Sequence, residues 1–91
     1  MANPVRDNPA RQRFELDIDG DTAFLGYRLA SGVLTLVHTE TPPEMRGKGA
    51  GSALVRGVLE LARTRGLRLV VLCDFVRAYM GKHPEFDDLL I

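Results

Sequence analysis

The first part of the chain alternates between apolar and polar side chains. Phe14, Leu16 and Ile18 are separated by acidic residues, and this is the period of a strand with one buried face. Asp19-Gly20 follows, and the pair is typical of a hairpin turn because glycine tolerates the positive φ that such turns need. The pattern predicts a strand that ends in a tight turn.

Two more strands are predicted before residue 41. In residues 22–29 every second side chain is apolar, and four of these share one face: Ala23, Leu25, Tyr27 and Leu29. Ser31-Gly32 indicates another turn. Residues 33–40 are apolar on both faces, which favours a position in the interior of the sheet. The three strands together predict an antiparallel meander.

From residue 50 the apolar residues recur at spacings of three and four, which is the period of a helix. We expect this helix over residues 49–66, with Gly66 as its C-terminal cap. Residues 67–73 are rich in valine and leucine and predict a buried strand parallel to residues 33–40. A short helix over residues 75–82 and an irregular tail, with Phe86, Leu89 and Leu90 as candidates to dock on the core, complete an α+β fold.

Composition narrows the class of protein. The 91 residues suit one domain, which we place at residues 13–91, behind a polar leader over residues 1–12 that is expected to be flexible. Formal net charge is zero, so nucleic acid is not an expected partner. The single cysteine and the lack of a long apolar run favour a cytoplasmic protein.

The stretch over residues 41–54 carries the strongest chemical signal. Gly47, Gly49 and Gly51 alternate just before the predicted helix, so backbone N–H groups can approach a ligand closely. A helix N-terminus adds unpaired donors and the positive end of the dipole. Arg46 and Lys48 add cationic side chains. This combination predicts a phosphate-binding site, and the alternative is a glycine-rich turn that only caps the helix.

The glycine spacing excludes two common phosphate motifs. A P-loop needs serine or threonine after Lys48, where this chain has Gly49, and the dinucleotide fingerprint needs a different glycine spacing. The pattern Arg46-x-x-Gly49-x-Gly51 instead resembles the pyrophosphate-binding signature of the GCN5-related N-acetyltransferases, the GNAT superfamily. That resemblance implies acetyl-CoA as the ligand.

Other segments extend the resemblance to a subfamily of small predicted N-acetyltransferases. They are residues 38–40, 43–49, 72–76 and 79–86. The resemblance implies a compact GNAT-like fold and direct transfer of an acetyl group to an amine, either a small molecule or a lysine or peptide amine. Two alternatives remain: an acyl-CoA-binding or protein-interaction module without catalysis, and a purely structural domain. A monomer or weak homodimer is expected.

The same resemblance implies that the strands over residues 33–40 and 67–73 splay apart around the thioester. His38 and Glu40 lie two apart and share a face, so either is a candidate general base. Cys73 is a candidate nucleophile, a residue lining the acetyl pocket, or a small buried hydrophobe. Tyr79 occupies the region where many members place the acid that protonates the departing thiolate. No paired ligand spacing supports a metal site.

The residues expected to contact the cofactor extend beyond the glycines. They are Thr39, Glu40, Thr41, Met45, Arg46, Gly47, Lys48, Gly49, Ala50, Gly51, Ser52, Cys73, Phe75 and Tyr79.

Overall fold

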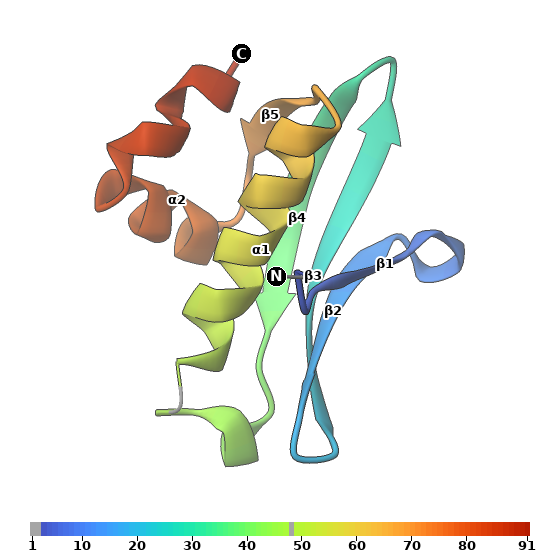
Figure 1. Ribbon diagram of the computed structural model, residues 1–91, viewed down its shortest axis with the longest axis vertical. Coiled ribbons are helices and arrows are strands. Elements are labelled where there is room, and N and C mark those ends of the chain that lie inside the picture. The colour runs from blue at the N-terminus through green and yellow to red at the C-terminus, as the bar shows by residue number, and fades with distance from the viewer. Residues whose placement is uncertain (1–2, 48) are drawn as a thin grey trace.

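The computed structural model describes residues 3–47 and 49–91 and is built on a five-stranded sheet (Figure 1). The strands are β1 (Arg6–Asn8), β2 (Arg13–Ile18), β3 (Asp21–Ala30), β4 (Val33–Glu40) and β5 (Arg68–Val71). The helices are α1 (Ala50–Thr64) and α2 (Asp74–Gly81), with 3-10 turns η1 (Pro9–Arg11), η2 (Pro43–Met45) and η3 (Pro84–Leu89). Strands β1 to β4 form antiparallel neighbours and β5 runs parallel to β4. The predicted α+β class and mixed sheet are therefore confirmed.

Both predicted hairpin turns are present, and each has two residues in the left-handed region. Asp19 and Gly20 have φ of 53° and 85°, and Ser31 and Gly32 have φ of 52° and 78°. Two consecutive positive φ angles suit the twist of the flanking strands. These turns fix the register of the meander from β2 to β4.

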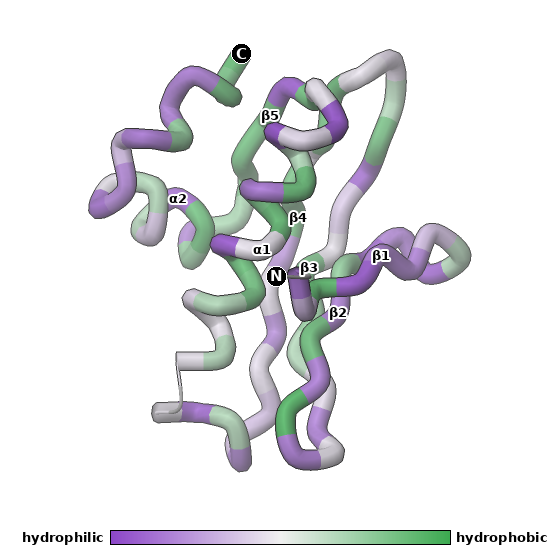
Figure 2. The backbone as a smooth tube through the Cα atoms, viewed as in Figure 1, coloured by the Kyte–Doolittle hydropathy of each residue, from purple (hydrophilic) through white to green (hydrophobic). Residues whose placement is uncertain are grey.

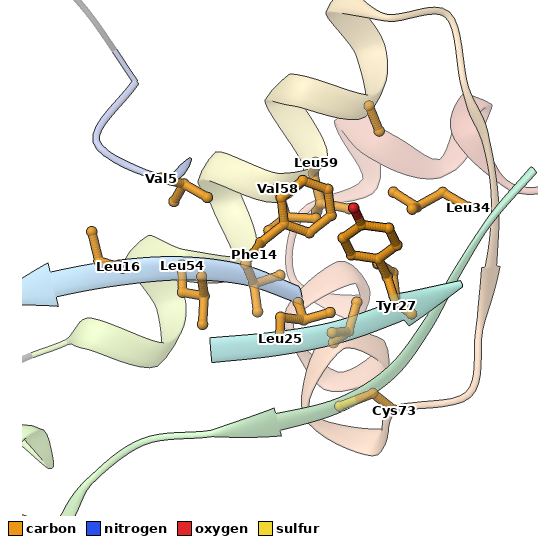
Figure 3. Packing of buried hydrophobic residues seen from close by; sticks show 14 of the residues in the cluster. Val5, Phe14, Leu16, Leu25, Tyr27, Leu34, Leu54, Val58, Leu59 and Cys73 are labelled. Atoms are coloured by element: carbon orange, nitrogen blue, oxygen red, sulfur yellow. The ribbon is translucent and has the colours of Figure 1, made fainter. Parts of the chain in front are cut away.

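One face of the sheet is covered by helices, and the core lies beneath them. Phe14 pairs with Leu25, and all three strands of the meander contribute buried side chains to this face. Helix α1 crosses the face (Figure 1) and packs Leu54, Val58 and Leu59 onto these strand residues (Figure 3). We call this the covered face and the opposite one the open face.

The expectation that the first twelve residues form a leader outside the fold is wrong for residues 3–12. Strand β1 is hydrophilic (Figure 2), yet it pairs with β2 through its backbone. Val5 is only 5% exposed, and the amide of Asn3 donates to the carbonyl of Gly57 at 2.9 Å. Backbone pairing and one apolar anchor thus suffice to hold this polar segment. Met1 and Ala2 lie outside the described residues.

The C-terminal third is more ordered than the sequence pattern indicates. Residues 84–89 form a 3-10 turn, which buries Phe86 and Leu89, where an irregular tail was expected. The last strand is shorter than residues 67–73, because its pairing with β4 ends at Val71. Leu72 is 59% exposed, and Cys73 directly precedes α2. Leu29 was expected on the buried face, but it is 48% exposed near the tip of the β3–β4 hairpin, which projects past the helices (Figure 1).

Candidate functional site

The N-terminus of α1 is built from glycine and lacks a side-chain cap. Gly47 and Gly49 have φ of 81° and 73°, a region that other residues adopt only with strain. Gly49 directly precedes the helix, and no side chain caps its first turn. The N–H groups of that turn have no partner within an α-helix, so they are left for water or for a ligand. Lys48 was expected to assist here but lies outside the described residues.

A hollow of about 380 Å³ opens beside this glycine turn. We call it the cradle hollow, and its lining residues are Thr41, Met45, Arg46, Gly47, Gly49, Ala50, Gly51, Ser52 and Phe75. Every one of them was in the set expected to contact the cofactor. Within the described residues, the guanidinium of Arg46 has no hydrogen bond or ion pair. A cation and an uncapped helix N-terminus therefore face the same space, which suits a phosphate group.

Gly51 allows α2 to approach α1 closely. A Cβ atom at this position would lie 2.8 Å from Cζ of Phe75, at the start of α2. Phe75 therefore lies directly over the first turn of α1 and forms one wall of the cradle hollow. The absence of a side chain at Gly51 is what leaves room for that wall.

Two further hollows adjoin the cradle hollow. The first, of about 480 Å³, is the α1–α2 hollow, and it shares Ser52 and Phe75 with the cradle. Its lining residues are Ser52, Ala53, Arg56, Phe75, Ala78, Tyr79, Lys82 and His83. The second, of about 410 Å³, is the open-face hollow, which shares Thr41 and Arg46 with the cradle. Its lining residues are Thr22, Phe24, His38, Thr39, Glu40, Thr41, Pro42, Pro43 and Arg46.

Strand β4 contains a bulge where it approaches these hollows. Gly26 pairs with His38, but the next residue, Tyr27, pairs with Leu36, so Val37 is an extra residue in β4. A bulge bends its strand and shifts the alternation of side chains between the two faces. The pairing between β4 and β5 also ends at Leu36. The two strands therefore diverge at the bulge, as the family resemblance implied.

The bulge decides which side chains face the helices. Thr39 pairs with Leu25, a residue of the covered face, so Thr39 lies on that face although it is three residues beyond Leu36. His38 and Glu40 lie on the open face, where their side chains are 62% and 63% exposed. His38 and Glu40 are thus on the side of β4 opposite to Thr39.

Cys73 and Thr39 form a pair on the covered face. Cys73 is 7% exposed at the N-terminus of α2, and its Sγ lies 3.3 Å from Oγ1 of Thr39 across the gap between the strands. Figure 3 shows Cys73 beside β4, at the margin of the core. On the other face, Nε2 of His38 lies 3.5 Å from Oε2 of Glu40. The thiol and the candidate bases are therefore two separate pairs.

Tyr79 lies in the α1–α2 hollow. Its ring stacks on His83 with centroids 4.1 Å apart, and its hydroxyl lies 3.4 Å from Nη1 of Arg56. The contact with Tyr79 is the main cause of the raised pKa of Arg56, and the nearby carboxylates of Glu60 and Glu85 raise this pKa further. Cys73 is not among the residues that line this hollow. The structure therefore does not bring Tyr79 and Cys73 into one hollow.

Sequence reasoning missed several lining residues. Arg56 follows Ser52 by one helical turn, so the helical period could have revealed it. Thr22 and Phe24 reach the open-face hollow because β3 pairs with the end of β4. That register depends on the bulge at Val37, which no sequence pattern indicated.

Comparison with known proteins now gives the family. The sequence profile described as GCN5-related N-acetyl-transferase matches residues 13–89. The chain belongs to the GCN5-related N-acetyltransferase family. The mouse (Mus musculus) protein NATD1 is 29% identical over 89 residues, covering 92% of this chain and 81% of that protein. Cattle (Bos taurus) NATD1 is 28% identical over 83 residues, covering 88% of this chain and 74% of that protein.

A solved structure supports the fold. The solution structure of a GCN5-like protein from Staphylococcus aureus superposes with a TM-score of 0.71 at 24% identity. The match covers all of this chain and 91% of that protein. The GNAT-like fold is therefore shown. Membership of the family supports a general acetyl-transfer function.

The described residues contain neither a metal-binding cluster nor a membrane-spanning helix. Over residues 3–47 and 49–91, histidine, cysteine and acidic side chains form no cluster that could hold a metal ion. In the same ranges no helix has the length and apolar character needed to cross a bilayer.

Proposed function

We propose that the protein binds acetyl-CoA and transfers its acetyl group to an amine. The observation that carries the proposal is the uncapped N-terminus of α1, which faces the cradle hollow near the point where β4 and β5 diverge. Gly47, Gly49 and Gly51 fit a pyrophosphate group, because side chains there would strain the backbone or fill the space beneath Phe75. Family membership in the acetyltransferases supports this choice of ligand.

Each part of the cradle hollow has a role in this proposal. Backbone N–H groups of residues 49–52 and the guanidinium of Arg46 would bind the pyrophosphate, since charge-assisted hydrogen bonds to phosphate are strong. The gap between Thr39 and Cys73 would receive the reactive end, in a half-buried site that excludes much of the water. Acetyl-CoA, when bound, supplies an acetyl group that its thioester activates.

The open-face hollow gives an amine access to the same gap from the opposite side of the sheet. His38 or Glu40 would accept the proton that the amine loses, since both line this hollow. Cys73 has two possible roles, either lining the acetyl site or accepting the acetyl group as a thiolate. Replacing Cys73 with alanine separates them, because full turnover by C73A would exclude the covalent role.

The test is calorimetric titration of the protein with acetyl-CoA, repeated on Gly49→Glu. The variant places an anion in the cradle hollow and should lose binding. Gly20→Glu is the matched control, because Gly20 also has a positive φ and open space around it, but lies in the β2–β3 turn. If the wild type and Gly20→Glu bind acetyl-CoA and Gly49→Glu does not, the cradle hollow is supported as the binding site. No binding by folded wild type would overturn the proposal.

The second candidate is an acyl-CoA-binding module without catalysis. The exposure of His38 and Glu40 favours it, because both candidate bases are left largely open to solvent. Both candidates bind acetyl-CoA, but only the enzyme forms acetylated product. Mass spectrometry of a panel of small amines and lysine peptides incubated with protein and acetyl-CoA distinguishes them.

A further inference from the structure

The α1–α2 hollow adjoins the cradle hollow. Ser52 and Phe75 line both hollows and therefore lie at the boundary between them. Ser52 and Arg56 are four residues apart on α1, which places their side chains about 5–6 Å apart on one face. A ligand whose phosphate is held at the N-terminus of α1 can therefore reach Arg56 with a second group that is one sugar ring away from that phosphate.

The walls of the α1–α2 hollow carry cations from both helices. These cations are Arg56 of α1 and Lys82, which directly follows α2. Within the described residues, the ammonium of Lys82 has no hydrogen bond or ion pair. The residues that line the α1–α2 hollow include these cations and no acidic side chain.

Arg56 is held in place without being fully engaged. Its Nε lies 3.7 Å from Glu60, and its Nη1 lies 3.8 Å from Glu85 and 3.4 Å from the hydroxyl of Tyr79. All three distances exceed those of good hydrogen bonds, so the guanidinium keeps donor capacity for a ligand. Glu60 and Glu85 partly offset the charge of Arg56, so Lys82 contributes a second positive charge to the hollow.

We infer that the α1–α2 hollow binds the 3′-phosphate of the coenzyme, with Arg56 and Lys82 as the residues that recognise it. This inference rests on the proposed function. In coenzyme A the 3′-phosphate and the pyrophosphate are attached to the same ribose, so a pyrophosphate bound in the cradle hollow would leave the 3′-phosphate close to the adjoining hollow. The protein then selects 3′-phosphorylated cofactors over their dephosphorylated forms.

The experiment compares acetyl-CoA with 3′-dephospho-acetyl-CoA by calorimetric titration of the full chain. We expect acetyl-CoA to bind about tenfold more tightly at low salt, since two exposed cations contact one phosphate. The ratio of the two affinities should shrink as salt rises to about 0.15 M, because screening weakens exposed charge pairs.

Variants then assign the preference to residues. The double variant Arg56→Gln/Lys82→Gln should bind both ligands equally, with the affinity for 3′-dephospho-acetyl-CoA unchanged. Arg77→Gln is the control, because Arg77 is an exposed cation of α2 that pairs with Asp74 and does not line the hollow. It should keep the tenfold ratio. Circular dichroism confirms that all three proteins are folded.

The outcomes are distinguishable. Equal affinities in the wild type, or a preference that survives in Arg56→Gln/Lys82→Gln, would overturn this inference and leave the proposed function standing. Absence of binding by either ligand to folded wild type would overturn both. A preference lost in the double variant and kept in Arg77→Gln is the result that supports the site.

Discussion

Strand β4 has two halves that differ in almost every respect, and the bulge at Val37 separates them. From Val33 to Leu36 the strand is paired on both sides, with β3 and β5, and buries Leu34 and Leu36. Beyond Val37 it pairs with β3 alone, and its side chains are exposed or half-buried. The first half contributes to stability, and the second half lines the hollows.

The difference follows from one extra residue. Without a bulge, the next residue on the same face as Leu36 would be His38, and Thr39 would lie on the open face. With the bulge, Thr39 faces Cys73, and His38 faces the opposite side with Glu40. A local irregularity in one strand therefore gives the site two faces, one for the thiol and one for the bases.

The largest expected effect comes from truncating the paired half. Leu36 is 0% exposed, so Leu36→Ala should lower the free energy of unfolding by about 3 kcal/mol, because it removes buried apolar surface and leaves a cavity. Val37→Ala, at a residue 38% exposed, should change it by about 0.5 kcal/mol. Urea denaturation measures both, and similar values would contradict the division of β4 into two halves.

A second prediction concerns the chemistry of the open face. His38→Ala or Glu40→Gln should lower the rate of acetyl transfer about 100-fold if that residue is the general base. The affinity for acetyl-CoA should stay the same in His38→Ala, because that side chain does not line the cradle hollow. Glu44→Gln is the control, since Glu44 is exposed and does not line the open-face hollow.

The reverse result would be informative as well. If Cys73→Ala abolishes turnover while His38→Ala and Glu40→Gln keep it, the reaction takes place on the covered face alone. Steady-state rates at saturating acetyl-CoA decide between the two faces.

Removing the bulge itself should have a moderate effect on binding. Deleting Val37 keeps Thr39 on the covered face and His38 on the open face, but it makes the strand regular. The bend then lessens, so β4 and β5 should stay closer together, and the affinity for acetyl-CoA should fall about tenfold. Unfolding should still be cooperative. Unchanged affinity by calorimetry would show that the bulge does not open the gap.

The smallest expected effect concerns Glu15, a buried carboxylate of β2 whose strand partner is Phe24. Arg13, then Asn8 and Arg6, lower the pKa of Glu15 below its ordinary value near 4.5. The folded state therefore holds the carboxylate more strongly than the unfolded state does. This stabilisation is complete above about pH 4.5 and is lost as pH falls through the lower pKa of the folded state.

The measurement is the urea midpoint of wild type and Glu15→Gln as pH is lowered. The variant should be less stable near neutral pH, and the difference should narrow below about pH 4.5. Glu60→Gln, on the exposed side of α1, serves as the control. A constant difference at every pH would mean that Glu15 contributes through packing and not through its charge.

The fold was largely predictable because its signals are local. The alternation in β2 and β3, the two glycine-containing turns and the helical period of α1 each fall within a few residues, and the structure has each element within about two residues of the expected bounds. The N-terminal segment was not predictable, since β1 is held by backbone pairing and by distant residues such as Gly57.

The sequence by itself determined the elements from β2 to α2, the family and the glycine turn, because all of these depend on residue type and short spacing. Only the tertiary structure decided which side chains share a face at the end of β4. That choice depends on the pairing of β3 with β4 and on the bulge at Val37, which place Thr39 beside Cys73 and turn His38 away. Strand register is set by contacts between distant segments, so a one-residue shift that reverses two faces leaves no pattern in the sequence.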